Sequence, residues 1–200
     1  MHQSAMIRMK WFVDNYVPKD KKVKVLDIGS YSVNGNYKEL FKGTQVEYVG
    51  LDITEGPNVD IAVKDPYSWI EIPDESFDFI ISGNAFEHIE YPWLTIKEIF
   101  KKLKWGGFVC ILAPFRLGEH RYPTDCYRYY PDGFRALAKW GGLKVINVTL
   151  GGLCGGLTTH SSENYDDTML VAAKALTEEG LDELPKLTEE GREYTIIRGN

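Results

Sequence analysis

The sequence contains little cysteine and lacks any long apolar run. Its three cysteines, Cys110, Cys126 and Cys154, are scattered, odd in number and form no C-x-x-C pair. This usage is typical of a protein kept reduced, so we expect a cytoplasmic location. No apolar stretch approaches the roughly 20 residues of a membrane span. The N-terminal "MHQSAMIRMKWFVDNY" carries charges within it. We therefore expect neither a membrane span nor a signal peptide.

Basic charge and phosphate-binding glycine motifs are also scarce. Lys and Arg number 23 against 29 Asp and Glu, which gives a net charge of −6. That balance argues against a general nucleic-acid binder, which normally presents a basic face. The sequence has no G-x-G-x-x-G and no Gly-Lys-Ser/Thr, so neither a dinucleotide loop nor a phosphate-binding loop is expected. Clustered His and carboxylate ligands are missing as well, and we predict no metal site.

The apolar pattern predicts strands that alternate with helices in one domain. Strands are predicted over residues 23–28, 46–51, 60–63, 77–82, 106–114, 143–150 and 168–173. Helical spacing covers residues 5–17, 37–41, 92–103 and 131–140. This alternation is typical of an α/β protein with a parallel sheet. We assign residues 1–175 to the domain and residues 176–200 to an acidic tail that is helical or partly disordered.

Acidic residues follow the first three predicted strands. Asp27 and Gly29 follow the first, Asp52 ends the second, and Asp65 comes after the third, where Asp60 is an alternative. In an open α/β sheet, ligands bind beyond the carboxyl ends of the strands. These side chains are therefore predicted to meet at one edge of the sheet.

Those residue types suit a ligand that has a ribose, an adenine and an ammonium group but needs no phosphate cradle. Asp52 can accept both ribose hydroxyls, and Asp65 can accept from the adenine amine. Ile53 can pack on the adenine ring. Asp27 can help to place a cationic amino-acid end, while Gly29 lets the backbone approach the ligand.

At this point the sequence resembles the class I methyltransferases that use S-adenosyl-L-methionine. The resemblance covers about residues 22–175 and is carried by "VLDIGS", "YVGLDI", "VKDPYSW", "IPDESFDFIISGNAFEHIEYPW" and "EIFKKLKWGGFVCILAPF". It implies a seven-stranded, mostly parallel Rossmann-like sheet with one antiparallel strand, here residues 168–173, and helices on both faces. It also implies S-adenosyl-L-methionine as the cofactor.

The resemblance implies further cofactor contacts. Ser30 would line the methionine end with Asp27 and Gly29, Pro66 would lie beside Asp65, and Ser82 and Asn84 would lie under the cofactor. The family usually has a second glycine two residues after the first, where this chain has Tyr31. The Tyr31 ring is expected either to close over the cofactor or to turn toward the acceptor.

A narrower resemblance concerns the acceptor. The segments "LDIGSYSVNGNY", "GPNVDI" and "EHRYPTDCYRYYPDGF" are similar to bacterial methyltransferases associated with glycosyltransferases and surface-polysaccharide synthesis. This similarity implies O-methylation of a sugar hydroxyl. Other readings are N-methylation of a small metabolite, a cofactor-binding module without catalysis, or a nicotinamide oxidoreductase, which the missing glycines disfavour. We expect a small-molecule or saccharide partner and a monomer or homodimer.

The loop after the fifth predicted strand carries the candidate acceptor residues. His120 is the first candidate base and His88 the second, while Asp125 is either a base or the residue that orients His120. Arg121, Arg128 and Tyr129 are candidate substrate contacts. The alternative is a loop pinned by an ion pair between Asp125 and an arginine, with tyrosines packing its base. Likewise, Glu87 and His88 form either an acid–base pair or a structural turn in which His88 is half-buried.

Overall fold

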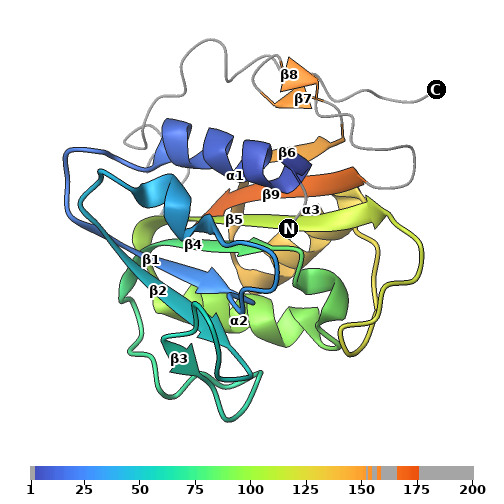
Figure 1. Ribbon diagram of the computed structural model, residues 1–200, viewed down its shortest axis with the longest axis horizontal. Coiled ribbons are helices and arrows are strands. Elements are labelled where there is room, and N and C mark those ends of the chain that lie inside the picture. The colour runs from blue at the N-terminus through green and yellow to red at the C-terminus, as the bar shows by residue number, and fades with distance from the viewer. Residues whose placement is uncertain (1–2, 152, 155–156, 159–165, 176–200) are drawn as a thin grey trace.

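A computed structural model describes residues 3–151, 153–154, 157–158 and 166–175 (Figure 1). It contains one seven-stranded sheet in the order β3-β2-β1-β4-β5-β9-β6 and a separate two-stranded ribbon, β7-β8. The predicted tail, residues 176–200, lies outside the described residues. The seven-stranded Rossmann-like sheet predicted from the sequence is confirmed.

The strands that build the site belong to the parallel part of the sheet. Their bounds are Val23–Ile28 (β1), Val46–Asp52 (β2), Ile61–Ala62 (β3), Phe77–Gly83 (β4) and Leu103–Arg116 (β5). Strands β3, β2, β1, β4 and β5 pair in parallel, so their carboxyl ends share one edge. The arrowheads of β1, β2 and β5 in Figure 1 point toward this edge.

The last strand reverses direction. Strand β9, Asp166–Ala173, pairs antiparallel with β5 on one side and with β6, Lys144–Leu150, on the other. Its start therefore lies beside the carboxyl end of β5. The short strands β7, Leu153–Cys154, and β8, Leu157–Thr158, were not predicted, because two-residue strands leave no alternation to detect.

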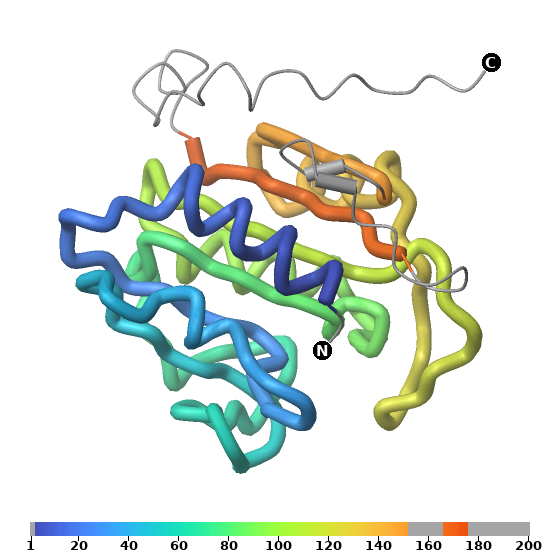
Figure 2. The backbone as a smooth tube through the Cα atoms, turned by 45° about the horizontal axis from the view of Figure 1, so that its top comes forward, coloured from blue at the N-terminus to red at the C-terminus, as the bar shows by residue number. Residues whose placement is uncertain are grey.

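Helices cover both faces of the sheet, as predicted. On one face, α1 (Gln3–Tyr16) and the short 3₁₀ helix η1 (Tyr37–Phe41) pack through one apolar cluster on β1, β4, β5 and β9. On the other face, α2 (Pro92–Lys102) and α3 (Pro131–Gly141) pack through a second cluster. Figure 2 shows α1 in front of the sheet and the other two α-helices behind it.

The boundary between α2 and β5 differs from the prediction. The helix was expected through Leu103, yet β5 begins at Leu103, which pairs with Phe77. Leu103 is fully buried. Its apolar side chain satisfies the helical pattern and the strand pattern equally, so periodicity alone could not place the boundary.

Candidate functional site

The predicted acids meet at the carboxyl edge of the sheet. Asp27 lies within β1 and Asp52 ends β2, while the turn at Gly29 connects β1 to η1. The backbone N–H groups of Gly29 and Ser30 both donate to the carbonyl oxygen of Leu51, at 2.9 and 3.1 Å. The glycine turn is thereby fastened to the end of β2, and Asp27 and Asp52 are brought close together.

Asp27 is a buried carboxyl with a single described side-chain partner. It is 3% exposed, and its Oδ2 accepts a hydrogen bond from the Tyr48 hydroxyl on β2. Burial raises the pKa of Asp27 to about 7; the hydrogen bond from Tyr48 opposes this rise, and nearby Asp52 adds to it. A cation placed beside Asp27 would favour its charged form.

Gly29 is required by its own packing. Its φ is +73°, and a Cβ built there would lie 2.4 Å from the Cβ of Ala85. The missing side chain thus makes room for Ala85 on the segment after β4. Backbone conformation and packing thus require glycine at this position, a reason that sequence reasoning did not supply; the approach of Gly29 to a ligand stays a prediction.

Asp52 is held in place by backbone N–H groups. Its Oδ2 accepts from Tyr31 N at 3.0 Å, and its Oδ1 accepts from Ile53 N at 2.8 Å and from Thr54 N at 3.3 Å. A carboxylate has about four lone-pair positions, so Oδ2 keeps one position for a hydroxyl group. Beside it, the Ile53 side chain is 60% exposed, which leaves an apolar surface next to the acid.

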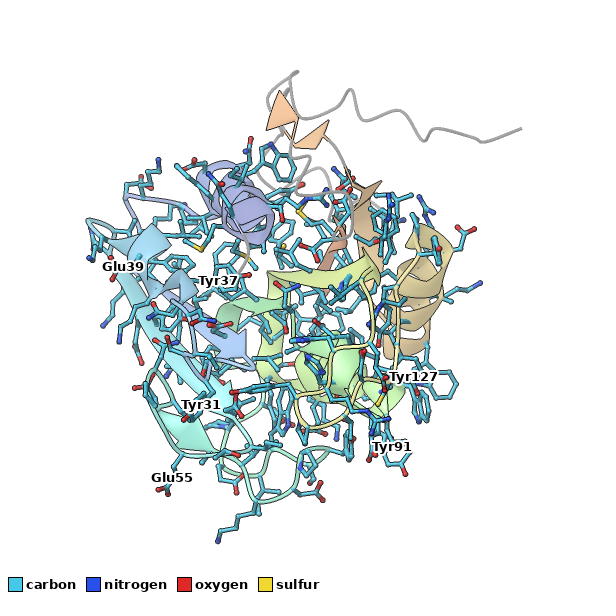
Figure 3. All side chains as sticks on the ribbon, turned by 45° about the vertical axis from the view of Figure 1, so that its right-hand side comes forward. Tyr31, Tyr37, Glu39, Glu55, Tyr91 and Tyr127 are labelled. Atoms are coloured by element: carbon cyan, nitrogen blue, oxygen red, sulfur yellow. The ribbon has the colours of Figure 1, made fainter. Side chains whose placement is uncertain are left out.

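The Tyr31 ring packs over Gly56. A Cβ at Gly56 would lie 2.2 Å from the Cε2 atom of that ring. Figure 3 shows Tyr31 near the end of β2, apart from Tyr37. The ring therefore covers the loop after β2 at the position where the family has a small glycine.

Asp60 and Asp65 differ in role. The Asp60 carboxylate accepts from the backbone N–H of Gly50 at 2.8 Å, and its own N–H donates to the Gly50 carbonyl. Asp60 therefore ties the loop to β2. Asp65 is exposed and accepts from Tyr67 N at 2.8 Å, while Pro66 accepts from the Trp69 indole. Both acids are exposed, but the Asp60 carboxylate is bound to the backbone of β2, whereas the Asp65 carboxylate is bound only within its own loop.

Two residues at the carboxyl end of β4, Ser82 within the strand and Asn84 just after it, are engaged with neighbouring strands. The hydroxyl of Ser82 is fully buried and donates to the carbonyl oxygen of Ile28 at 3.0 Å. Asn84, with a φ of +57°, donates from Nδ2 to Asp167 Oδ1 at 3.1 Å. Ser82 joins β4 to β1 beneath the turn, whereas Asn84 links the end of β4 to the start of β9.

Three buried carboxyls, Asp27, Glu87 and Asp167, lie within electrostatic reach of the Tyr37 hydroxyl, and we call them the carboxyl cluster. All three raise the pKa of Tyr37, although burial raises it more. The Tyr37 hydroxyl fills the space beside Gly83, where a Cβ would lie 2.0 Å from it. Sequence reasoning did not foresee this gathering, because Tyr37 and Asp167 are far apart in the chain.

Arg8 brings helix α1 to this edge. Its guanidinium is fully buried and donates to the Asp167 carbonyl at 2.8 Å and to Asp166 Oδ1 at 3.4 Å. A buried guanidinium needs such partners, since the cost of removing a charge from water is large. Arg8 thus fixes the start of α1 against β9, beside the carboxyl cluster.

The loop of residues 117–130, which we call the acceptor loop, is held by Arg128. Both Asp125 oxygens accept from Arg128, at 2.6 and 2.7 Å. The same guanidinium donates to the carbonyl oxygens of Leu117, Gly118 and Tyr127. The ion pair foreseen as the structural alternative is therefore present, and Arg128 has its donors committed to the loop.

Asp125 also accepts from the backbone N–H of His120 at 2.6 Å. Hydrogen bonds from Arg128, the largest cause, and from His120 hold the pKa of Asp125 well below its usual range. Such a carboxylate is a poor proton acceptor. It positions the main chain of His120, while the His120 side chain is exposed and its ring lies 5.2 Å from the His88 ring.

The other predicted acceptor contacts fall into different environments. Tyr129 is buried, donates from its hydroxyl to the Phe86 carbonyl and stacks on Phe134 at 4.6 Å. That places Tyr129 in the core. Arg121 is exposed and pairs with Glu119 at 2.7 Å. Tyr91 and Tyr127 lie together in Figure 3, and the Tyr127 hydroxyl donates to the Glu90 carbonyl.

The site fits the cofactor that the sequence implied. Asp52 with exposed Ile53 offers a carboxylate beside an apolar surface, which suits a ribose and an adenine. The buried atoms Ser30 Oγ, Tyr37 OH and Glu87 Oε2 make no hydrogen bond within the described part of the chain. Buried polar atoms are usually paired, so these three point to a polar ligand at this edge.

Within residues 3–151 and the other described segments, no group of three His, Cys, Asp or Glu side chains is placed to hold a metal ion. Over the same residues, no helix combines the length and apolar character that a membrane crossing requires.

Comparisons with known proteins agree with this geometry. The sequence profile of a family described as "Methyltransferase domain" matches residues 26–111. No match was found among curated protein sequences. A methyltransferase from Archaeoglobus fulgidus, described as S-adenosylmethionine-dependent, is 20% identical, with a TM-score of 0.59, over 83% of this chain and 93% of that one.

Two other solved structures share the fold. The [4+2]-cyclase SpnF is 14% identical, with a TM-score of 0.66, over 85% of this chain and 82% of that one. Phosphoethanolamine N-methyltransferase 2 from Haemonchus contortus, solved with S-adenosyl-L-methionine, is 15% identical, with a TM-score of 0.59, over 86% of this chain and 52% of that one. Residues 26–111 of this chain are therefore similar to a methyltransferase domain, and the chain as a whole shares the fold of solved S-adenosylmethionine-dependent methyltransferases.

Proposed function

We propose that the protein transfers a methyl group to a hydroxyl of a small molecule or saccharide, as in the methylation of a sugar during surface-polysaccharide synthesis. When bound, the cofactor would supply a methyl group that is activated by the positively charged sulfur to which it is attached. The observation that carries the proposal is the Asp52 carboxylate, oriented by three backbone N–H groups beside exposed Ile53. It supports ribose and adenine binding at this edge.

In the proposed binding mode the cofactor follows the carboxyl ends of β1, β2 and β4. Asp52 binds the ribose, Ile53 flanks the adenine, and Asp65 with Pro66 takes the adenine amine. The methionine end lies by Asp27, Gly29, Ser30 and Tyr31, with Ser82 and Asn84 beneath it. Much of the catalytic effect then comes from lining up the reacting atoms and excluding water.

A hydroxyl acceptor must lose its proton at or near transfer. The proposed bases are His120, which is exposed on the acceptor loop, and His88, which lies 5.2 Å from it between ring centroids. Asp125 supports His120 through its backbone N–H. Arg121 remains a proposed acceptor contact, since it is exposed. Arg128 and Tyr129 are no longer proposed as acceptor contacts, because Arg128 holds the acceptor loop and Tyr129 packs in the core.

N-methylation of a small amine is a second candidate. The three buried carboxyls of the carboxyl cluster would favour a cationic amine, and one similar structure is an N-methyltransferase. Transfer of a radiolabelled methyl group to panels of monosaccharides and of small amines separates the two. Transfer to neither panel would favour a binding module, and the cyclase among the similar structures shows that this fold also serves other reactions.

The first test is the cofactor site itself. Replacement of Asp52 by alanine removes the carboxylate proposed to accept from the ribose. We expect the affinity for S-adenosyl-L-methionine to fall by about two orders of magnitude or more, measured by titration calorimetry. The control is Glu55→Ala, which removes an exposed acid from the same loop. Wild-type affinity in the Asp52 variant would reject this binding mode.

A further inference from the structure

Glu87 is a buried carboxyl with an oxygen that makes no hydrogen bond to the described residues. It lies on the 3₁₀ helix η2, Phe86–His88, which follows β4 at the carboxyl edge. Its exposure is 1%, and its Oε2 has no described partner. An unpaired buried carboxyl is costly, so such a group calls for an explanation.

The groups around Glu87 keep it titratable near neutral pH. Burial is the largest cause and raises its pKa to about 8; Asp167 on β9 and Asp125 on the acceptor loop add to the rise. Its own backbone N–H and Arg128 oppose it. His88 also faces Glu87, and the hydroxyls of Tyr37 and Tyr129 lie within its electrostatic reach.

His88 connects Glu87 to the surface. Its Nδ1 lies 2.6 Å from the carbonyl oxygen of Thr124. A carbonyl only accepts, so Nδ1 carries the proton and Nε2 keeps its lone pair. That Nε2 lies 3.7 Å from Glu87 Oε1. The His88 side chain is 14% exposed, against 2% for the Glu87 side chain. On the solvent side of His88 lies the exposed His120 ring, with 5.2 Å between the two ring centroids.

Glu87, His88 and His120 therefore form a row of groups that runs from the interior to the surface, and Glu87 is its buried end. Both Glu87 and Asp27 act on the Tyr37 hydroxyl, so Glu87 shares the carboxyl cluster with the acid proposed to face the methionine end. Burial of the cluster shields it from water, which strengthens the effect of any nearby charge.

We propose that Glu87, rather than His120 or His88, is the group that takes the proton of the acceptor hydroxyl, and that His88 carries this proton toward solvent. The O–H bond breaks as its electron pair forms the new O–CH₃ bond. The pair of the old S–CH₃ bond stays on sulfur, and the proton goes to Glu87 Oε2. From Glu87 the proton passes to His88 Nε2 and leaves on the side of His120. This inference rests on the proposed methyl transfer to a hydroxyl.

The role of Glu87 can be tested through ligand binding alone, because the donor sulfur is positively charged and no methyl transfer is needed. A cation beside a protonated carboxyl lowers its pKa and expels its proton. S-adenosylmethionine carries that charge, whereas S-adenosylhomocysteine does not. At pH 7 the first ligand should therefore release more protons on binding than the second, by at most about one proton per molecule for each carboxyl that responds.

The experiment is calorimetry of both ligands in buffers of different ionisation enthalpy, with wild-type protein, Glu87→Gln and the control Glu90→Gln, an exposed acid three residues away. We expect the excess proton release to shrink in Glu87→Gln and to persist in the control. An unchanged excess in Glu87→Gln overturns the role of Glu87. Absence of binding by either ligand to wild-type protein overturns the proposed function as well.

A second variant tests the relay and covers the case in which Glu87→Gln fails to fold. His88→Asn retains an N–H donor for Thr124 but removes Nε2. We expect normal proton release on ligand binding, together with loss of at least about tenfold in methyl transfer to the monosaccharide that accepts the label. Full transfer by His88→Asn would overturn the relay.

Discussion

Tyr48 is the residue that makes buried Asp27 tolerable. Its hydroxyl donates to the carboxyl, and Asn58 bridges to the same hydroxyl at 3.4 Å and to the Ser30 carbonyl at 3.0 Å. A buried acceptor that loses its donor carries its full desolvation cost. The glycine turn and the acid it presents therefore depend on a tyrosine from the neighbouring strand.

Tyr48→Phe should consequently destabilise the protein by about 1–3 kcal/mol, because Asp27 is left buried without its donor. Urea unfolding monitored by circular dichroism measures the loss. Tyr130→Phe is the matched control, since that ring is exposed. Equal stability of the two variants would mean that the Tyr48 hydroxyl contributes little to the folded state.

Some residues at the carboxyl edge could be predicted from the sequence, and others could not. Asp52 and Asp65 could be proposed as site residues because strand ends carry a local pattern. Tyr37, Asp167 and Arg8 belong to no local pattern, and they meet only when β9 enters the sheet. Glu87 was considered only beside His88, because burial and an unpaired oxygen leave no trace in the sequence.

At the scale of elements, the acceptor loop is organised by one side chain. Arg128 donates to both oxygens of Asp125 and to three backbone carbonyls. Arginine forms such a planar set of donors, and lysine does not, although it carries the same charge. The shape of the loop is therefore more sensitive to geometry than to charge.

Arg128→Lys should loosen the acceptor loop without changing the affinity for S-adenosylmethionine. We expect trypsin to cut at exposed Arg121 several-fold faster, because proteolysis tracks local opening. Arg135→Lys on α3, where an exposed ion pair is replaced, serves as the control. If both variants are cut at the wild-type rate, the loop is held by other contacts.

The elements themselves followed largely from the sequence. Strands β1, β4 and β5 are apolar runs buried on both faces, a pattern that predicts central parallel strands. Helix α3 has Pro131 at its start, and its cap, Gly142, has a φ of +85°. What the pattern did not contain was the direct passage from α2 into β5, where Leu103 suits either element.

At the scale of the whole molecule, two buried carboxyls set a pH dependence of stability. Asp27 and Glu87 titrate near pH 4 in an unfolded chain but near 7 and 8 when folded. Between those values the folded state binds more protons than the unfolded state. The free energy of unfolding therefore falls as pH rises through this window.

We expect the thermal midpoint of the cofactor-free protein to be lower at pH 8.5 than at pH 6.5, by roughly 2–4 °C for each kcal/mol lost. Burial is the main cause that lowers the pKa of His88, so His88 makes the free energy of unfolding rise with pH below about 6.5. Measurements that start at pH 6.5 largely avoid this opposite effect. Calorimetric melting of Asp27→Asn should show a flatter dependence than wild type. A midpoint that rises over this interval would contradict the assignment.

The position of β9 has a consequence for how the protein is made. A ribosome releases the chain from its N-terminus, and β9 is the last of the seven strands to emerge. Before β9 is synthesised, β5 and β6 each expose the edge that pairs with β9 in the folded protein. Arg8 likewise lacks its partners Asp166 and Asp167 until then. Unpaired edges invite association with other chains. Synthesis of the final strand therefore closes the sheet and completes the site in a single late event.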